Sequence, residues 1–309
     1  MPNLKDIEKR INSVRSTKQI TRTMEMVAAA KIRRANERVE AATPYADSMA
    51  EMLAHVAELV KGSDCALLQT HDEVKCTLIV AVVSDRGLAG GFNANVLRRV
   101  ERLMKEKAAI GIQTHLIACG KKAVGYFNYR KIKPVLEFRD LSADPTVEEA
   151  ASIAAYAIEG YTSGAIDEVV VVYNHAKNAA EQVLREERIL PVDTGVLLAA
   201  REGTYHRELK AERDSAQEKA RLHGEFAFEP SAEAVLDRLA PAYVKTTLYH
   251  ALIDSAAGEQ GARRNAMKSA TDNATEMVDT LTRIYNRVRQ GAITTEISEI
   301  VGGAAALEE

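Results

Sequence analysis

One glycine-rich segment has residue types and spacing that could bind a phosphate, Ser84-Asp85-Arg86-Gly87-Leu88-Ala89-Gly90-Gly91. It follows an apolar, β-branched run and precedes a helical pattern, and in α/β sheets phosphates bind at such places on free backbone N–H groups. The spacing is GxxGG rather than GxGxxG, and no Lys-Ser/Thr pair follows, as a mononucleotide-binding loop requires. Spacing alone therefore favours a tight turn that lets a helix cross close to the sheet, with a nucleotide site as the alternative.

The other residue types that carry chemistry are scattered. Cys65, Cys76 and Cys119 form no CxxC pair and have no histidine at ligand spacing, which excludes a zinc site or a disulfide framework and favours a reducing compartment. The seven histidines form no HExxH motif, and no GxSxG elbow or kinase signature occurs. These absences weaken the case for an enzyme. They do not exclude one, because an active site can still assemble from dispersed residues.

Charge and hydropathy restrict the function classes further. The 309 residues carry a net charge of −3, which argues against a dedicated nucleic-acid binder, and no apolar run reaches the roughly 18–20 residues of a membrane helix. The first 38 residues nevertheless hold ten Lys or Arg against four acids. No aromatic residues are interleaved there for base stacking, so an acidic protein partner or ordinary solvation explains this basic stretch.

The chain begins with a long helical pattern. Between Leu4 and Val60 glycine is absent, and Pro44, the only proline, is expected to kink the helix rather than end it. Four apolar residues have the 3-4-3 spacing of a coiled-coil seam: Leu4, Ile7, Ile11 and Val14. The spacing resumes after a two-residue shift in phase, which predicts a locally irregular supercoil, at Ile20, Met24 and Val27.

The C-terminal part mirrors this pattern. A helix is expected to start at Pro230-Ser231 with Ser231 as its N-cap. Its apolar stripe repeats every three or four residues through Ala266, Ala270, Ala274, Met277, Leu281, Ile284 and Val288. Two long amphipathic helices at opposite ends of one chain most simply pair with each other, antiparallel. The alternatives are that each packs on a globular core, or that part of the stripe binds another chain.

The middle of the chain alternates strands and helices. Apolar β-branched runs typical of strands buried on both faces lie at 77–83, 115–118 and 168–173, with helical stretches at 94–107, 121–129 and 147–161. This alternation predicts a small, Rossmann-like, mostly parallel α/β domain. We therefore expect a fold of class α/β plus α, with an N-terminal helix (1–62), an inserted α/β domain (74–195), a charged, solvated segment (196–228) and a C-terminal helix (230–309).

Three segments together carry a family resemblance. They run from Ile20 to Ala35, from Ser84 to Asn93 and from Ala266 to Val301, and their order and content closely resemble the gamma subunits of F-type ATP synthases over the whole chain. The last segment is long and specific, whereas the glycine segment alone is weak evidence.

The resemblance implies a non-catalytic rotor subunit. In that family the terminal helices form the shaft inside a ring of alpha and beta subunits, and the α/β domain is a foot that rests with the epsilon subunit on the membrane c ring. The implied function is to couple ion-driven rotation to ATP synthesis, or the reverse, and to regulate ATPase activity and ion flow. The implied location is peripheral, on the cytoplasmic face of the bacterial membrane, with no cofactor, no metal, no nucleic acid and no direct membrane insertion.

The resemblance also assigns roles to residues. It implies contacts between shaft and stator at Met24, Arg289, Gln290 and Thr294. An apolar bearing is implied at Ile297, Ile300 and Val301. The turn of the foot domain, which binds no nucleotide in the family, is formed by Asp85, Arg86, Gly87, Gly90 and Gly91. The basic N-terminal helix would face acidic loops of the beta subunits.

Two departures from the family pattern bear on regulation. Ala89 stands where many members have cysteine, and residues 197–224 are longer than in most bacterial members but contain no cysteine, which excludes thiol control there. Two competing hypotheses stay open on the residues alone: a free-standing nucleotide-dependent enzyme that uses the 84–93 turn, and a coiled-coil adaptor outside any ATPase. The coupling ion and the net direction of the reaction are not encoded in this chain.

Overall fold

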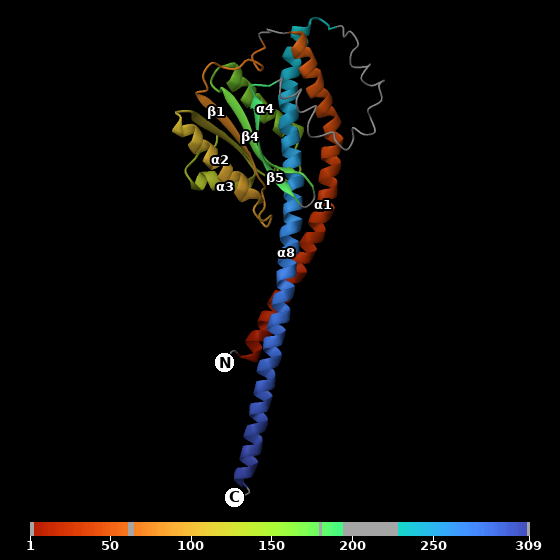
Figure 1. Ribbon diagram of the computed structural model, residues 1–309, viewed down its shortest axis with the longest axis vertical. Helices are drawn as coiled ribbons and strands as arrows, with labels where there is room; N and C mark the ends of the chain where they lie inside the picture. Colours follow the sequence, from red (N-terminus) through yellow and green to blue (C-terminus); the bar gives the residue numbers. More distant parts are fainter. Residues whose placement is uncertain (1–2, 61–64, 179–180, 194–227, 308–309) are drawn as a thin grey trace. The chain divides into compact units, whose positions relative to one another are not determined.

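The computed structural model describes residues 3–60, 65–178, 181–193 and 228–307. It contains two compact units, unit 1 with Met1–Lys31 and Arg263–Glu309, and unit 2 with Ile32–Ala262. Figure 1 shows the elements, of which the first and last helices each contribute to both units. The described elements are α1 (Leu4–Leu59), β1 (Cys76–Val82), α2 (Phe92–Ala109), β2 (Gln113–Cys119), α3 (Lys121–Tyr129), β3 (Leu136–Phe138), α4 (Val147–Thr162), β4 (Glu168–Ala176), β5 (Gln182–Leu190) and α8 (Ala232–Leu307).

Unit 2 is built around one five-stranded sheet with the order β3-β2-β1-β4-β5. The first four strands are parallel, and β5 pairs antiparallel with β4. Ile79 in the central strand pairs with Leu116 on one side and Val170 on the other. The mostly parallel α/β fold and its three apolar strands are confirmed.

Two strands were not predicted from the sequence. β3 has only three residues, too few for a periodic signal. β5 carries four consecutive charged residues, Arg185-Glu186-Glu187-Arg188, and most of its side chains are partly or fully exposed. An antiparallel edge strand needs only one buried face, and charged side chains protect its free edge from other strands, so a continuous apolar run is not required.

The sheet is buried on both faces, because alternate residues of each strand point to opposite sides. In β1, Leu78, Val80 and Val82 join a core that includes α4 and the part of α8 before Ala262, whereas Ile79 and Ala81 join a core with α2 and α3. Figure 1 shows α2 and α3 on one face of the sheet and α4 on the other. This double burial explains why β1 reads as an unbroken apolar run.

In unit 1 the N-terminal part of α1 pairs with α8, and the seam keeps its phase. Ile7, Ile11 and Ala28 are buried, and the Oγ1 atoms of Thr21 and Thr271 lie 2.8 Å apart in the seam. The predicted two-residue phase shift is wrong, since Ile20 and Val27 are 60% and 51% exposed. Short Thr and Ala side chains occupy the seam here because they allow the two helices to approach closely. The Thr hydroxyls can be buried because they are hydrogen-bonded.

The predicted stripe of α8 is partly wrong for the same reason. Met267, Thr271 and Ala274 are buried, whereas Met277 and Ile284 are exposed. Thr271 lies in the seam although it is polar, so counting apolar residues alone selected neighbouring positions on the helix surface.

The start of α8 agrees with the sequence. The N–H of Ala234 donates to Oγ of Ser231 at 3.2 Å, which confirms Ser231 as a capping residue.

Pro44 lies inside α1, which continues beyond it to Leu59. Residues 196–227 of the charged segment lie outside the described part of the chain. In the part that is described, none of the helices has an apolar stretch of the length that crossing a bilayer requires.

The first residue before α3 is a glycine that the fold requires. Gly120 has φ +97°, and a Cβ atom there would lie 2.2 Å from the carbonyl oxygen of Val83. Gly111 also has a positive φ, +81°, but has open space around the same position. A substitution at Gly111 would introduce backbone strain alone, whereas one at Gly120 would introduce the same strain and a steric clash.

We predict that Gly120→Ala destabilises the chain by more than about 3 kcal/mol, because strain at positive φ adds to a clash with backbone. Gly111→Ala, which introduces strain alone, should cost about 1 kcal/mol. Urea unfolding of the two purified variants measures both values. Equal destabilisation by the two substitutions would contradict the clash.

Candidate functional site

The glycine-rich segment forms a hydrogen-bonded turn at the carboxyl end of the parallel strands. Asp85 Oδ1 accepts from the backbone N–H groups of Lys121 and Asp140 at 2.8 and 2.9 Å, and Oδ2 accepts from the N–H of Ser142 at 2.9 Å. Ser142 Oγ in turn accepts from the N–H of Asp85 at 3.0 Å. One carboxylate thus connects β1, the start of α3 and the loop after β3.

The remaining residues of the turn shape its backbone. Ser84 and Asn93 exchange hydrogen bonds, with the N–H of Ser84 donating to Asn93 Oδ1 at 2.9 Å. The carbonyl oxygen of Arg86 accepts from Ser84 Oγ, while the Arg86 and Gly87 residues themselves are exposed. Gly90 has φ +57°, and Gly91 is the N-cap of α2 without a side-chain hydrogen bond.

The place of an anion at the start of α3 is already occupied. Lys121 is the first residue of this helix, and its N–H points at the Asp85 carboxylate rather than at a free space. Burial opposes ionisation of Asp85, but the backbone N–H groups of Lys121, Ser142 and Asp140 prevail and hold the pKa of this carboxyl below its usual value. The geometry therefore supports the tight-turn interpretation of the segment.

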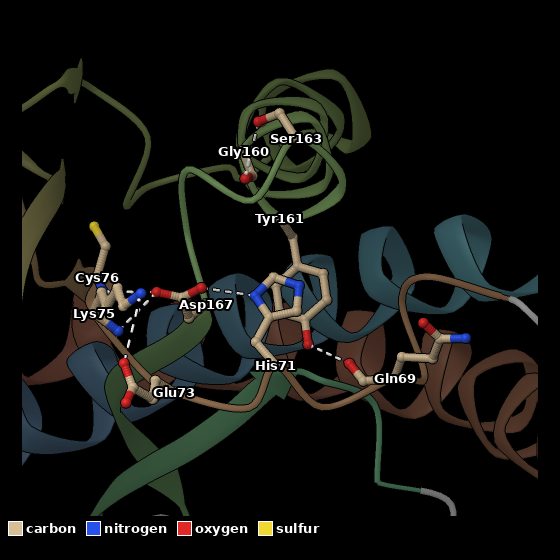
Figure 2. A network of polar contacts seen from close by, with 9 residues as sticks. All are labelled: Gln69, His71, Glu73, Lys75, Cys76, Gly160, Tyr161, Ser163 and Asp167. Atoms are coloured by element: carbon tan, nitrogen blue, oxygen red, sulfur yellow. Dashed lines mark hydrogen bonds and ion pairs between the residues drawn. The ribbon is translucent and has the colours of Figure 1, made fainter.

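A second polar network holds the chain between α1 and β1, as Figure 2 shows. Asp167 Oδ2 accepts from the N–H groups of Lys75 and Cys76 at 2.8 Å each, and Oδ1 lies 2.7 Å from Nδ1 of His71. The His71 ring stacks on Tyr161, with 4.5 Å between the ring centroids, and the Tyr161 hydroxyl donates to the carbonyl oxygen of Gln69. This network was not predicted, because its members are far apart in the sequence.

The groups in the network of Figure 2 hold the fold and include no activated nucleophile. Burial opposes ionisation of Asp167, yet its bonds to His71 and to the backbone of Cys76 and Lys75 keep its pKa below the usual value. Burial raises the pKa of the Cys76 and Cys119 thiols, so neither is an activated thiolate. Within the described ranges no three His, Cys, Asp or Glu side chains are grouped so that they could hold a metal ion.

Among the residues of unit 1 that the structure describes, no helix lies beside the C-terminal end of α8. Thr21 and Thr271 lie opposite each other, and each helix rises by about 1.5 Å per residue. Leu4, where α1 begins, is 17 residues before Thr21, and Val288 is 17 residues after Thr271. Every residue from Arg289 to Val301 is exposed, and Figure 1 shows this end of α8, in dark blue, continuing past the start of α1, in red.

This unpaired end carries an apolar face. Ile293, Ile297, Ile300 and Val301 follow the i, i+4, i+7, i+8 spacing of one helix face, and they are 47%, 56%, 67% and 62% exposed. Three of them were expected as the apolar bearing, and Ile293 was missed although its spacing to Ile297 could have identified it. An exposed aliphatic face of this kind is typical of a contact surface for other chains.

The predicted polar contact residues lie on the same end. Arg289, Gln290 and Thr294 are exposed, and Thr294 Oγ1 donates to the carbonyl oxygen of Gln290 within the helix at 2.9 Å. Met24 of α1 is half-buried. The roles of these four residues, and those of the turn and the bearing, stay predictions.

The fold and these surfaces define a coiled-coil subunit with an inserted α/β domain and a helix end that is exposed from Arg289 to Val301. A family model described as ATP synthase matches residues 3–307. The chain is 42% identical to the ATP synthase gamma chain of Symbiobacterium thermophilum over 99% of both chains, and 40% identical to that of Chlorobaculum tepidum over 100% of both. The chain therefore belongs to the gamma subunits of F-type ATP synthases, the non-catalytic subunits of the central stalk.

Solved structures agree with the fold. A chain from the central stalk and c ring of the Tetrahymena thermophila mitochondrial ATP synthase is 26% identical, with a TM-score of 0.56 over 81% of this chain and 99% of that chain. A chain of the Euglena gracilis mitochondrial ATP synthase is 20% identical, with a TM-score of 0.63 over 98% of this chain and 94% of that chain. The second likeness supports the fold alone.

The turn gives a prediction with a defined pH dependence. Asp85→Ala should destabilise the chain by about 3 kcal/mol, because three backbone N–H groups lose their acceptor at about 1 kcal/mol each. Since the pKa of Asp85 is lowered in the folded state, its contribution is present above the ordinary pKa of about 3.9 and disappears as the pH falls through the folded value. Urea unfolding of parent and variant between pH 7 and pH 3 measures the difference.

Asp144→Ala is the matched control, because Asp144 is an exposed carboxylate whose ion pair with Arg38 lies at the surface. Its cost should stay within about 1 kcal/mol. A difference between parent and Asp85→Ala that stays constant down to pH 3 would show that the carboxylate is not what holds the turn.

Proposed function

We propose that this chain is the rotor that couples ion-driven rotation of a membrane c ring to conformational cycling of catalytic beta subunits. The direction is ATP synthesis, or ATP-driven ion pumping in reverse, and the chain regulates ATPase activity and ion flow. Its partners are the alpha and beta subunits, the epsilon subunit and the c ring, on the cytoplasmic face of a bacterial membrane. One rotor can bias three chemically identical sites differently because each site contacts a different side of it.

The exposed end of α8 is the observation that carries this proposal. A single helix with an aliphatic face at Ile297, Ile300 and Val301 has no partner helix within the described part of unit 1, so in isolation it exposes apolar surface. Inside a ring of subunits, these side chains would turn against an apolar sleeve. Apolar contacts are non-directional, so they oppose rotation less than a fixed set of hydrogen bonds does.

Polar residues next to the bearing would supply the contacts that depend on angle. Arg289 presents a planar set of donors suited to a carboxylate, and Gln290 and Thr294 can each donate and accept. We assign these three residues, with Met24 of α1, to contacts with the beta subunits. The basic part of α1 would face acidic loops of the same subunits.

The α/β domain would serve as the foot. We propose that the turn at Asp85, Arg86, Gly87, Gly90 and Gly91 maintains the shape of this domain and binds no nucleotide, since the Asp85 carboxylate fills the anion position. Terminal helices at 1–62 and 230–309, a foot at 74–195 and a charged segment at 196–228 are the functional divisions that follow from this assignment.

Removing two side chains at the end of α8 tests the proposal. Arg289→Ala with Gln290→Ala should leave folding and assembly intact, because both residues are exposed. Charge-assisted hydrogen bonds contribute about 1.5–3 kcal/mol, against about 0–1 kcal/mol for a solvated ion pair, so their loss should slow steady ATP hydrolysis and ATP-driven pumping. Both rates are measured on the assembled complex in vesicles.

The matched control is Arg283→Ala with Asn286→Ala, an exposed arginine and amide on the same helix within its paired part. It should retain the turnover and pumping of the parent complex. An assembled Arg289→Ala, Gln290→Ala complex with parental rates would remove these residues from the contact with beta.

A further inference from the structure

In unit 2, α8 passes through a stretch in which it is buried all round. From Ala251 to Gly261 every residue is buried except Ala256, which is half-buried. Several of the buried side chains are polar or charged: Asp254, Ser255, Glu259 and Gln260. Buried polar groups must be hydrogen-bonded, and hydrogen bonds depend on direction, so a helix held in this way resists turning more than one held by apolar contacts alone.

Asp254 connects α8 to the end of β4. Its side chain is only 3% exposed, Oδ1 accepts from the N–H of Ala176 at 3.0 Å, and Oδ2 lies 2.7 Å from Nδ1 of His175. β4 is an inner strand that pairs with β1 and β5. One carboxylate therefore fixes α8 to the backbone and to a side chain of the inner strand β4.

Gly258 brings the next turn of the helix against the same strand. A Cβ atom at this position would lie 3.1 Å from the carbonyl oxygen of Asn174 and 3.4 Å from Cε2 of Phe92. The Asn174 amide also donates to the carbonyl oxygen of Phe92, the first residue of α2, at 2.8 Å. A continuous set of contacts thus joins α2, the end of β4 and α8.

We propose that Asp254 and Gly258 form the joint through which the α/β domain turns α8. This rests on the proposed function, in which torque enters the chain at the foot and leaves it through the terminal helices. Because α8 continues as one helix to Leu307, an angular displacement at 254–258 is passed on to the exposed end. Asp254 and Gly258 are positioning residues in this role, since neither touches a nucleotide.

The experiment separates the stiffness of the joint from folding. Variants Asp254→Ala, Asp254→Asn and Gly258→Ala are assembled into the complete complex. A probe is attached to the α/β domain at Tyr129→Cys, a position that is 89% exposed. The angular spread of the probe in the stalled complex, ATP-driven ion pumping in vesicles, and ATP hydrolysis by the catalytic part detached from the membrane are measured. Thermal unfolding of each variant is recorded beside them.

A joint predicts a graded result. The angular spread should be smallest in the parent, larger in Asp254→Asn, which keeps an acceptor for Ala176, and largest in Asp254→Ala. Pumping, which loads the foot, should fall in the same order, while hydrolysis by the detached catalytic part stays within about twofold of the parent. Gly258→Ala should increase the angular spread and lower pumping in the same direction, because an added Cβ would lie 3.1 Å from the carbonyl oxygen of Asn174 and requires a shift of a few tenths of an ångström between helix and strand.

Two control substitutions leave the joint intact. Asp279→Ala removes an exposed carboxylate from α8, and Gly125→Ala adds a Cβ in α3 with nothing within 4 Å. Both should match the parent in angular spread and pumping. If Asp254→Ala does not assemble, Asp254→Asn and Gly258→Ala decide the question.

The outcomes distinguish the joint from the proposed rotor function. Parental angular spread and pumping in folded Asp254→Asn and Gly258→Ala complexes would overturn the joint, as would an equal fall in pumping and in detached hydrolysis. If the parent complex itself neither assembles with alpha and beta subunits nor pumps ions, the rotor function fails instead.

Discussion

The register of the helix pair in unit 1 depends on the contact between Thr21 and Thr271, whose Oγ1 atoms lie 2.8 Å apart in the seam. Each hydroxyl has one hydrogen, so one threonine donates to the other, which in turn donates to a backbone carbonyl of its own helix, that of Lys18 or Met267. The pair is therefore satisfied while it is buried. A polar pair in a seam disfavours other alignments, because sliding would bury each hydroxyl against an apolar side chain. With this register, α1 begins level with Val288, and everything that follows on α8 to Val301 is exposed. The bare helix end is thus a consequence of where the two threonines meet.

In the α/β domain the polar contacts that fix the fold are made by carboxylates rather than by hydroxyl groups. Its polar anchors are carboxylates that collect backbone N–H groups, Asp85 beyond the ends of the parallel strands and Asp167 before β4. Asp85 is half-buried and Asp167 is buried, and each keeps a pKa below its ordinary value because the bonds it accepts outweigh the effect of burial. Such anchors fix loops that have little apolar surface of their own. They also explain why a glycine-rich turn after a buried strand need not be a phosphate site.

Sequence patterns identified the elements in which burial and composition agree. β1 and β4 are buried on both faces and read as apolar runs, and the helical stretch expected at 121–129 matches the bounds of α3. β5 was missed because an edge strand tolerates four charged residues in a row. The phase of the seam was misjudged at Ile20 because Thr21 is buried in its place. Gly120 was not recognised, since only the path of Val83 in space shows why a side chain is excluded there.

The functional residues were harder to predict from the sequence than the elements of the fold. No spacing rule identifies Arg289, Gln290 or Thr294, and their assignment depends on family resemblance, although the structure places all three on the exposed end of α8. The contacts of Asp254 were hidden from the sequence, because His175 and Ala176 lie 79 and 78 residues earlier in the chain, in another element. A rotor must hold firmly at one end of a helix and slip at the other. In this chain, α8 is buried at 251–261, where Asp254 bonds to the end of β4, and it presents bare aliphatic side chains at 293–301, so the surroundings of a single helix change along its length.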